Sequence, residues 1–309
     1  MSQLLPGNQD SKKPVSSNEQ MSAGANIAQT PAGAGLLGID VGTSGIKAVV
    51  FDLNGKTIAS SFQEYPLLTP KPQWAEQNPE DWWQATCLAC QQLLAADGVS
   101  AERILGLSFS GQMHGSVFLD KDGSVVRPCI LWCDARTGEE CRIITEKAGR
   151  DNLHAWTSNP ALAGFTAPKA IWLQRHEPEN FDKVRTLLLP KDYVRFRFTG
   201  ELSTEVSDNA GTLLFNVGTK KWAAELLKVL GIPEGWMPPI YESFEITGRV
   251  TEIASKQTGL KVGTPVVAGG ADNPCGAIGT GVVSEGQMFS SIGSSGVVFA
   301  PCSGLKVDP

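Results

Sequence analysis

Several features that would place this 309-residue chain in a common class are missing from its sequence. No apolar run approaches the roughly 20 residues that a membrane-spanning helix needs, so no membrane partner is expected. The sequence has no cluster of basic residues of the kind that binds a nucleic-acid backbone, and its formal net charge is -6. No nucleic-acid partner is therefore expected. A negative chain can still bind ATP, because phosphate recognition depends on local backbone N–H groups, Mg²⁺ and a few cations.

The seven cysteines lack the even number and the regular spacing of a disulfide framework. Cys87 and Cys90 form a CxxC in a predicted helix, but no second pair follows at the spacing of a zinc site. Small buried side chains on one helix face are the favoured interpretation. Reduced thiols, together with the lack of a basic and then apolar opening segment, predict a cytoplasmic location.

What is present indicates a folded chain of one large domain or two. Hydrophobic residues make up 41% and charged residues 19%, which allows a sizeable core. Residues 1–34 are rich in Ser, Asn, Gln, Ala and Gly and have little apolar surface to bury, so they are predicted to form a disordered tail. Folding signals begin at Leu36.

Strand patterns precede helix patterns along the chain. Segments 36–41, 46–52 and 57–63 read as strands, and Asn54-Gly55 is a strong signal for a hairpin turn. Asn78-Pro79 and the acids after it predict a helix start. Further expected elements are strands at 104–110, 125–132 and 262–270 and helices at 137–147 and 276–283. An antiparallel meander followed by strand–helix alternation predicts a mixed α/β domain.

One segment of the sequence is repeated in weakened form. Residues 39–45 (Ile-Asp-Val-Gly-Thr-Ser-Gly) resemble residues 290–296 (Ser-Ser-Ile-Gly-Ser-Ser-Gly), and apolar strand patterns lie on both sides of each. A duplicated hairpin is the favoured interpretation. It predicts one domain over residues 35–284 and a second, truncated domain of the same type over residues 285–309.

The two glycine-rich turns are candidate phosphate loops. Glycine lets backbone N–H groups converge on an anion, and Ser or Thr hydroxyls add donors. Alone the motif is a weak signal, and an ordinary turn is the alternative. Asp40 sharpens the functional interpretation, because a carboxylate within an apolar strand needs a cation or hydrogen-bond donors nearby. A Mg²⁺–phosphate site would supply that partner.

Asp272 is placed like a catalytic base. It follows a predicted buried strand, lies in a glycine-rich loop and precedes Asn273. The alternative is that its carboxylate only caps the following helix.

Two further groups suit a sugar. His114 offers a donor and an acceptor at a strand end, and Met113 offers an apolar contact, although a lone histidine is more often structural. Trp132 is followed by Asp134 and Arg136, and an aromatic face beside polar groups can pack on the C–H face of a sugar. A buried Trp next to a surface Asp–Arg pair is the alternative.

These motifs together resemble the FGGY family of carbohydrate kinases. The match extends from about Leu36 to Ala300, and the segment 112–115 (Gln-Met-His-Gly) is most similar to the xylulokinase branch. Segments that carry the resemblance are 38–45, 74–79, 82–83, 112–115, 164–179, 189–193, 207–212 and 245–248.

The resemblance implies an actin/hexokinase-like (ribonuclease H-like) ATPase fold, with a complete N-terminal sugar-binding domain and a truncated ATP-binding domain. It implies ATP-dependent phosphorylation of D-xylulose with Mg²⁺, and leaves a homodimer open. Asp272 would be the general base, and Asp40 would lie by Mg²⁺ and the phosphates. The implied sugar contacts are Met113, His114, Asp272, Asn273 and, less directly, Trp132. The implied phosphate loops are Thr43, Ser44 and Gly45, and Gly293, Ser294 and Ser295.

Two departures from the family pattern stand near the expected site. Residues 269–276 read Gly-Gly-Ala-Asp-Asn-Pro-Cys-Gly where xylulokinases usually have Gly-Gly-Gly-Asp-Asn-Ala-Ala-Gly, and Pro274 lacks an N–H. Ser294 replaces a usual Thr but keeps the hydroxyl. Another pentulose kinase such as a ribulokinase, a non-catalytic sugar-binding module and a structural partner of a second chain stay open as alternatives.

Overall fold

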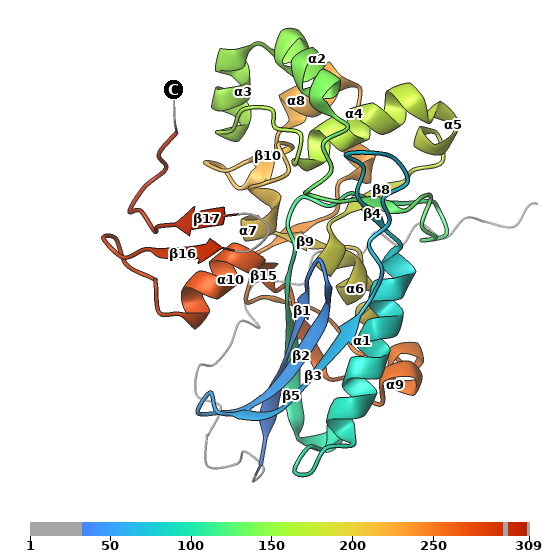
Figure 1. Ribbon diagram of the computed structural model, residues 1–309, viewed down its shortest axis with the longest axis vertical. Coiled ribbons are helices and arrows are strands. Elements are labelled where there is room, and N and C mark those ends of the chain that lie inside the picture. The colour runs from blue at the N-terminus through green and yellow to red at the C-terminus, as the bar shows by residue number, and fades with distance from the viewer. Residues whose placement is uncertain (1–32, 293–295, 308–309) are drawn as a thin grey trace, which may run out of the picture. The chain divides into compact units, whose positions relative to one another are not determined.

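The computed structural model describes residues 33–292 and 296–307 (Figure 1). Contacts group Gly33–Pro309 into one compact unit. The predicted tail at residues 1–34 therefore lies almost wholly outside the described residues. Among the helices described, none is long and apolar enough to cross a bilayer.

A seven-stranded sheet forms the centre of the unit, in the order β13-β14-β5-β1-β2-β3, with β15 also paired to β5. The predicted meander is confirmed, because β1, β2 and β3 pair antiparallel in sequence order. β5 runs parallel to β1, and β14 runs parallel to β5. The strands of this sheet are β1 (Gly35–Val41), β2 (Gly45–Asp52), β3 (Thr57–Glu64), β5 (Ile104–Gly111), β13 (Ile246–Arg249), β14 (Pro265–Val267) and β15 (Gly270–Ala271).

One face of the sheet is covered by a helix that begins where the sequence predicted. The Asn78 side chain accepts a hydrogen bond from the N–H of Glu80 at 3.2 Å, with Pro79 in the first turn. The helix packs against β2 and β3 and buries Trp82 and Trp83 in the main core (Figure 1). Cys90 is buried on the same helix and Cys87 partly so, which confirms the structural interpretation of that pair.

The remaining helices include a group that encloses a second apolar core. This core collects residues of α2, α3, α4 and α8, which gather at one end of the unit (Figure 1). The helices are α1 (Pro79–Leu94), α2 (Gly138–Ala148), α3 (Arg150–Thr157), α4 (Thr166–His176), α5 (Pro178–Phe181), α6 (Pro190–Thr199), α7 (Val206–Asn209), α8 (Ala224–Leu230), α9 (Glu252–Thr258) and α10 (Asp272–Gly279), with short 3₁₀ turns at Ala101–Arg103 and Glu234–Trp236.

Short two-stranded ribbons complete the fold. One of them replaces the long strand expected over residues 125–132, where the structure has a strand only at Cys129–Ile130. The pairs are β4 (Glu76–Gln77) with β7 (Cys129–Ile130), β6 (Val117–Leu119) with β8 (Thr186–Leu188), β9 (Thr204–Glu205) with β12 (Ile240–Tyr241), β10 (Phe215–Asn216) with β11 (Lys221–Trp222), and β16 (Phe289–Ile292) with β17 (Gly296–Phe299).

The expected single strand at 262–270 was wrong, because the structure has two short strands there, β14 and β15, with a break between them. Gly269 lies at the break with φ +84°, and a Cβ there would stand 2.4 Å from the carbonyl oxygen of Phe109. Only glycine allows this close approach to β5. The helix expected at 276–283 begins earlier, at Asp272, because the chain turns directly out of β15 into α10.

The repeated segment forms the expected second hairpin. β16 and β17 pair antiparallel, with Ile292 opposite Gly296. Its turn, where Gly293, Ser294 and Ser295 were predicted as a phosphate loop, lies outside the described residues.

Candidate active site

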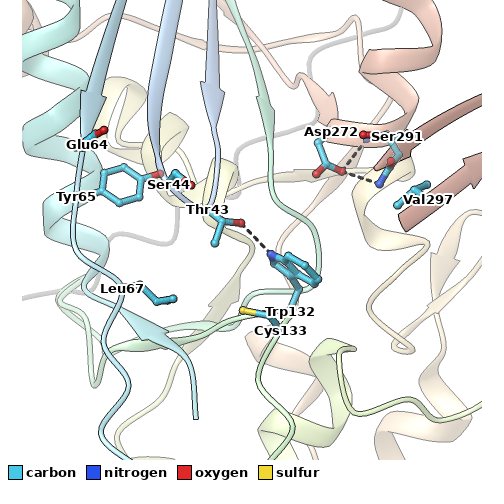
Figure 2. Close-up of a pocket in the computed structure, with 11 residues that line it drawn as sticks. Thr43, Ser44, Glu64, Tyr65, Leu67, Trp132, Cys133, Asp272, Ser291 and Val297 are labelled. Atoms are coloured by element: carbon cyan, nitrogen blue, oxygen red, sulfur yellow. Dashed lines mark hydrogen bonds between the residues drawn. The ribbon is translucent and has the colours of Figure 1, made fainter. Parts of the chain in front are cut away.

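A cavity of about 840 Å³ brings together residues from several distant segments (Figure 2). Five of the predicted site residues line it: Thr43, Ser44, Trp132, Asp272 and Asn273. Its other lining residues are Glu64, Tyr65, Leu67, Cys133, Ser291 and Val297. The last two flank the second glycine-rich turn, so the second hairpin borders the same space as the first.

The sheet topology explains why these residues meet. β1 and β5 are parallel and end side by side, at Val41 and Gly111, and β15 pairs with the same end of β5. The turn after β1, the segment after β5 and the start of α10 therefore leave the sheet at one edge. Ligand sites of α/β folds commonly lie at such carboxyl ends of parallel strands.

Asp272 stands on the cavity wall at the first position of α10. Its Oδ1 accepts hydrogen bonds from the N–H of Asn273 at 2.7 Å and from the Asn273 side chain at 3.0 Å (Figure 2). The N-cap residue of α10 is Ala271, and α10 has no side-chain cap hydrogen bond. The alternative that Asp272 only caps the helix is therefore wrong. Partial desolvation raises the pKa of Asp272, the N–H of Asn273 opposes this rise, and the charge of Asp40 adds to it.

Asp40 sits on β1 and does not line the 840 Å³ cavity. It lines a neighbouring cavity of about 350 Å³, together with Lys47, Ser110 and Cys275. Burial raises the pKa of Asp40, while a hydrogen bond with Ser110 and the charge of Lys47 lower it. Lys47 is the cross-strand partner of Asp40.

The carboxylates of Asp40 and Asp272 are close enough to affect one another, and both are disfavoured in their ionised forms. This is the environment in which a divalent cation lowers the free energy of the ionised pair. Among the described residues no group of three or more His, Cys, Asp or Glu forms a dedicated metal cage. The arrangement suits Mg²⁺, which is commonly held by one or two carboxylates together with water and substrate phosphates.

The hydroxyl of Thr43 is used within the protein. It accepts a hydrogen bond from the indole N–H of Trp132 at 2.9 Å (Figure 2). It also donates to Oε1 of Gln112 at 3.2 Å. Within the described part of the chain, the main-chain N–H groups of Thr43 and Ser44 have no protein partner. Any phosphate contact from this turn is therefore expected from these N–H groups and from the exposed Ser44.

Three side chains that sequence reasoning missed support the same turn. The Gln77 amide donates to the carbonyl oxygen of Thr43 at 2.7 Å, and Gln112 donates to that of Gly42 at 3.2 Å. The Tyr65 hydroxyl also donates to the Gly42 carbonyl. Gln77 and Gln112 belong to segments that carried the family resemblance. Both are far from the turn in the sequence, so their hydrogen bonds to it could not be predicted.

Gly45 is required at the start of β2 for steric reasons. A Cβ there would stand 2.5 Å from the carbonyl oxygen of Gln63 and 2.7 Å from the ring of Phe62. Gly45 therefore closes the turn tightly.

His114 is held in a defined tautomer. Its Nδ1 lies 2.7 Å from the carbonyl oxygen of Gly211, and its ring stacks on Phe165 with centroids 4.8 Å apart. A carbonyl can only accept, so Nδ1 carries the proton and Nε2 is left as an acceptor. Burial lowers the pKa of His114 to about 4, so the ring is neutral at pH 7.

Met113 and His114 do not line the 840 Å³ cavity, but Met113 contacts Asn273, which does. The Asn273 amide lies 3.8 Å from the Met113 sulfur. The structure thus joins the 112–115 motif to the start of α10, two groups that are 160 residues apart in sequence.

A buried lysine that sequence reasoning missed fixes the backbone at His114. Lys169 is fully buried in α4 and donates to the carbonyl oxygens of His114 at 2.8 Å and Gly164 at 2.7 Å. Burial lowers the pKa of Lys169 to about 7. A neutral amine has two N–H donors, which these two carbonyls satisfy.

Asp134 and Arg136 serve the fold and not the cavity. Asp134 is buried, accepts from the N–H of Ala75 at 2.7 Å and pairs with Arg136 at 2.7 Å. The guanidinium of Arg136 lies 3.6 Å from the ring centroid of Trp74. The alternative of an Asp–Arg pair at the surface is therefore wrong, because both side chains are buried. In this segment, Trp132 and Cys133 line the cavity.

The fold is of the actin/hexokinase-like class that its solved structural neighbours share. The model of the FGGY family of carbohydrate kinases, N-terminal domain, matches residues 36–279. The chain belongs to this family. It is 48% identical over 265 residues to the xylulose kinase of Bacillus subtilis (strain 168), a match that covers 86% of this chain and 53% of that protein.

Other relatives agree on the fold and on the extent of the match. The xylulose kinase of Escherichia coli (strain K12) is 41% identical, over 88% of this chain and 55% of that protein. The solved xylulose kinase from Rhodospirillum rubrum superposes with a TM-score of 0.85 at 28% identity, over 89% of this chain and 56% of that one. A gluconate kinase from Lactobacillus acidophilus gives 0.83 at 27% identity, over 89% and 56%. The chain thus spans about half the length of the relatives it matches.

Proposed function

We propose that this chain belongs to a cytoplasmic xylulokinase, which transfers the γ-phosphoryl group of ATP to the C5 hydroxyl of D-xylulose and releases ADP. The observation that carries the proposal is the position of Asp272, on a cavity wall shared with Trp132, Asn273 and the turn after β1. Relatives named xylulose kinase, 41–48% identical, support the choice of sugar.

The proposed reaction needs a general base, groups that bind the sugar and groups that bind the phosphates. Asp272 takes the proton of the attacking hydroxyl, for which its raised pKa makes it a stronger base than an ordinary aspartate. Neutral His114 offers Nε2 as an acceptor for a sugar hydroxyl, next to Met113 and Asn273. The exposed face of Trp132 packs on the sugar's C–H groups.

The phosphate side is built from the turn after β1. The free N–H groups of Thr43 and Ser44 hold phosphate oxygens, and Gly45 keeps the turn tight. Gly293, Ser294 and Ser295 are proposed to form the matching loop of the second hairpin. Asp40, with Asp272 nearby, would hold Mg²⁺, which neutralises charge on the transferring group when bound. Residues 35–284 are proposed as the sugar-binding domain and residues 285–309 as the start of the ATP-binding domain.

The test is ADP formation with Mg²⁺-ATP and a panel of D-xylulose, D-ribulose, D-gluconate and glycerol. The proposal predicts the largest kcat/KM for D-xylulose. Preference for D-ribulose or D-gluconate would assign another kinase of the family. Binding of D-xylulose without ADP formation would instead support a sugar-binding module.

Asp272→Ala should abolish phosphoryl transfer and leave ATP binding intact, because the proton acceptor is lost while the phosphate loop is unchanged. Asp122→Ala is the matched control, since the Asp122 carboxylate only pairs with Lys121 at the surface. Near-normal turnover of the Asp272 variant would show that another group is the base.

A further inference from the structure

Five charged side chains form a fully buried cluster behind the candidate site. Lys191 Nζ lies 2.8 Å from Asp192, 3.3 Å from Glu205 and 3.3 Å from Asp208, and Arg195 lies 3.2 Å from Asp192. All five are 0% exposed. Buried ion pairs seldom stabilise a fold more than packed apolar side chains would, because desolvation offsets their attraction. A contribution to stability alone therefore does not explain the cluster.

Glu205 connects the cluster to its surroundings. Its carboxylate faces Lys191 on one side and accepts hydrogen bonds from the N–H groups of Ser207 at 2.7 Å and Asp208 at 2.8 Å. It also accepts from the hydroxyls of Ser207 at 3.0 Å and Ser243 at 2.9 Å. This carboxylate is thus fixed by four donors besides the lysine.

The Ser207 hydroxyl carries the connection to the candidate site. A carboxylate can only accept, so the Ser207 O–H points toward Glu205. Its lone pairs then face the N–H of Ala271, which donates to Ser207 Oγ at 3.0 Å. Ala271 is the last residue of β15 and immediately precedes Asp272.

Main-chain hydrogen bonds hold the residues just before this point, from the N–H of Ala268 to Glu245 at 2.9 Å and from that of Gly269 to Ser243 at 3.0 Å. β15 has two residues, Gly270 and Ala271, paired with the end of β5. A Cβ on Gly270 would stand 2.8 Å from the Cys275 sulfur and 3.4 Å from Ser207 Oγ, so the backbone here rests directly on Ser207. The Ser207 hydroxyl is the side-chain group that receives the N–H of Ala271, at the point where β15 ends and α10 begins.

We propose that Ser207 is a positioning residue, which uses the buried charged cluster as an anchor to hold Asp272 at the angle required to accept the sugar's proton. This proposal rests on the proposed function for its catalytic consequence, but the link itself is a property of the described residues. Misplacing a catalytic group by about 1 Å can reduce the rate on the order of a hundredfold.

The kinetic test compares Ser207→Ala, Ser207→Thr and Ser243→Ala in the enzyme that phosphorylates D-xylulose. Ser207→Ala should lower kcat by about tenfold or more and change the KM for ATP little, because Asp272 moves while the phosphate loop does not. Ser207→Thr keeps the hydroxyl and should recover most of kcat. Ser243→Ala removes a donor to the same carboxylate without touching residue 271, so it should keep kcat near the parent value.

A structural readout makes the two proposals separable. Hydrogen exchange of the Ala271 amide should accelerate in Ser207→Ala and stay unchanged in Ser243→Ala. Unchanged exchange in Ser207→Ala, or equal losses of kcat in both variants, would overturn the positioning role. A parent protein that phosphorylates no sugar would defeat the proposed function, and amide exchange would then decide alone whether Ser207 holds residue 271.

Discussion

The indole N–H of Trp132 donates a hydrogen bond of 2.9 Å to the hydroxyl of Thr43, which joins the proposed sugar side of the cavity to its proposed phosphate side. The same hydroxyl donates to Gln112, one residue before Met113 and two before His114. Through these two bonds, Thr43 connects Trp132 with the segment that carries Met113 and His114.

Replacing this threonine should disturb both sides of the cavity. Thr43→Val keeps the shape of the side chain but removes both hydrogen bonds, and should lower the free energy of unfolding by about 1 kcal/mol. The affinity for D-xylulose should fall with it, because Trp132 loses its fixed orientation. Urea unfolding and calorimetric titration with D-xylulose measure the two effects.

Thr43→Ser is the matched control, since it keeps the hydroxyl and should restore sugar affinity. Ser44→Ala should weaken nucleotide binding and leave sugar affinity unchanged. Equal loss of sugar affinity in Thr43→Val and Thr43→Ser would show that the methyl group, and not the hydroxyl, is what matters.

Gly211 shapes the pocket of His114. A Cβ on residue 211 would stand 2.2 Å from Cε1 and 2.5 Å from Nδ1 of the imidazole, so Gly211→Ala should force the ring away from the Gly211 carbonyl. We expect a loss of stability of about 1–3 kcal/mol from overpacking and a clear loss of D-xylulose affinity. Thermal unfolding and titration with the sugar are the measurements.

Gly138→Ala serves as the comparison, because a Cβ at that helix start meets nothing within 4 Å. Its stability and sugar affinity should match those of the parent. Unaltered sugar affinity in Gly211→Ala would argue that the imidazole does not contact the sugar.

The buried Lys169 predicts a pH dependence of stability. Its pKa is lowered to about 7 in the folded chain, whereas an unfolded lysine titrates near about 10.4. Between these values the unfolded state binds more protons, so the lysine's contribution to stability rises with pH and is smallest below about pH 7. The stability of the parent relative to Lys169→Met should thus increase from pH 6.5 to pH 9.

Urea unfolding of both proteins at several pH values measures this difference, and shared titrating groups cancel in it. Lys256→Met, at an exposed helix position, is the control for the substitution itself. A constant difference for Lys169→Met would mean that its amine stays charged in the folded state.

The individual strands, turns and helix starts were largely predictable, because their signals are local. The Asn54-Gly55 turn, the start at Asn78-Pro79 and the strand at Ile104 follow from turn chemistry, capping and apolar runs. The break at Gly269 was missed, because it is caused by the close approach of the Phe109 carbonyl oxygen on another strand. A long-range steric contact leaves no periodic trace in the sequence.

The candidate site was predictable as a set of residues but not as a set of contacts. Asp272, Asn273, Trp132, Thr43 and Ser44 lie on one cavity as the motifs indicated. The supporting groups were out of reach, because Lys169, Gln77 and Ser207 act through hydrogen bonds to backbone groups far away in sequence. Neither charge pattern nor residue spacing in the sequence predicts such a hydrogen bond.

Calorimetric titration of the 309-residue chain with D-xylulose, with D-ribulose and glycerol alongside, tests the central claim most directly. The account predicts saturable heat with D-xylulose, at least tenfold tighter binding than for the other two, and loss of this preference in Gly211→Ala. Equal affinity for all three compounds, or no heat with any of them, would contradict a pentulose site built by these residues.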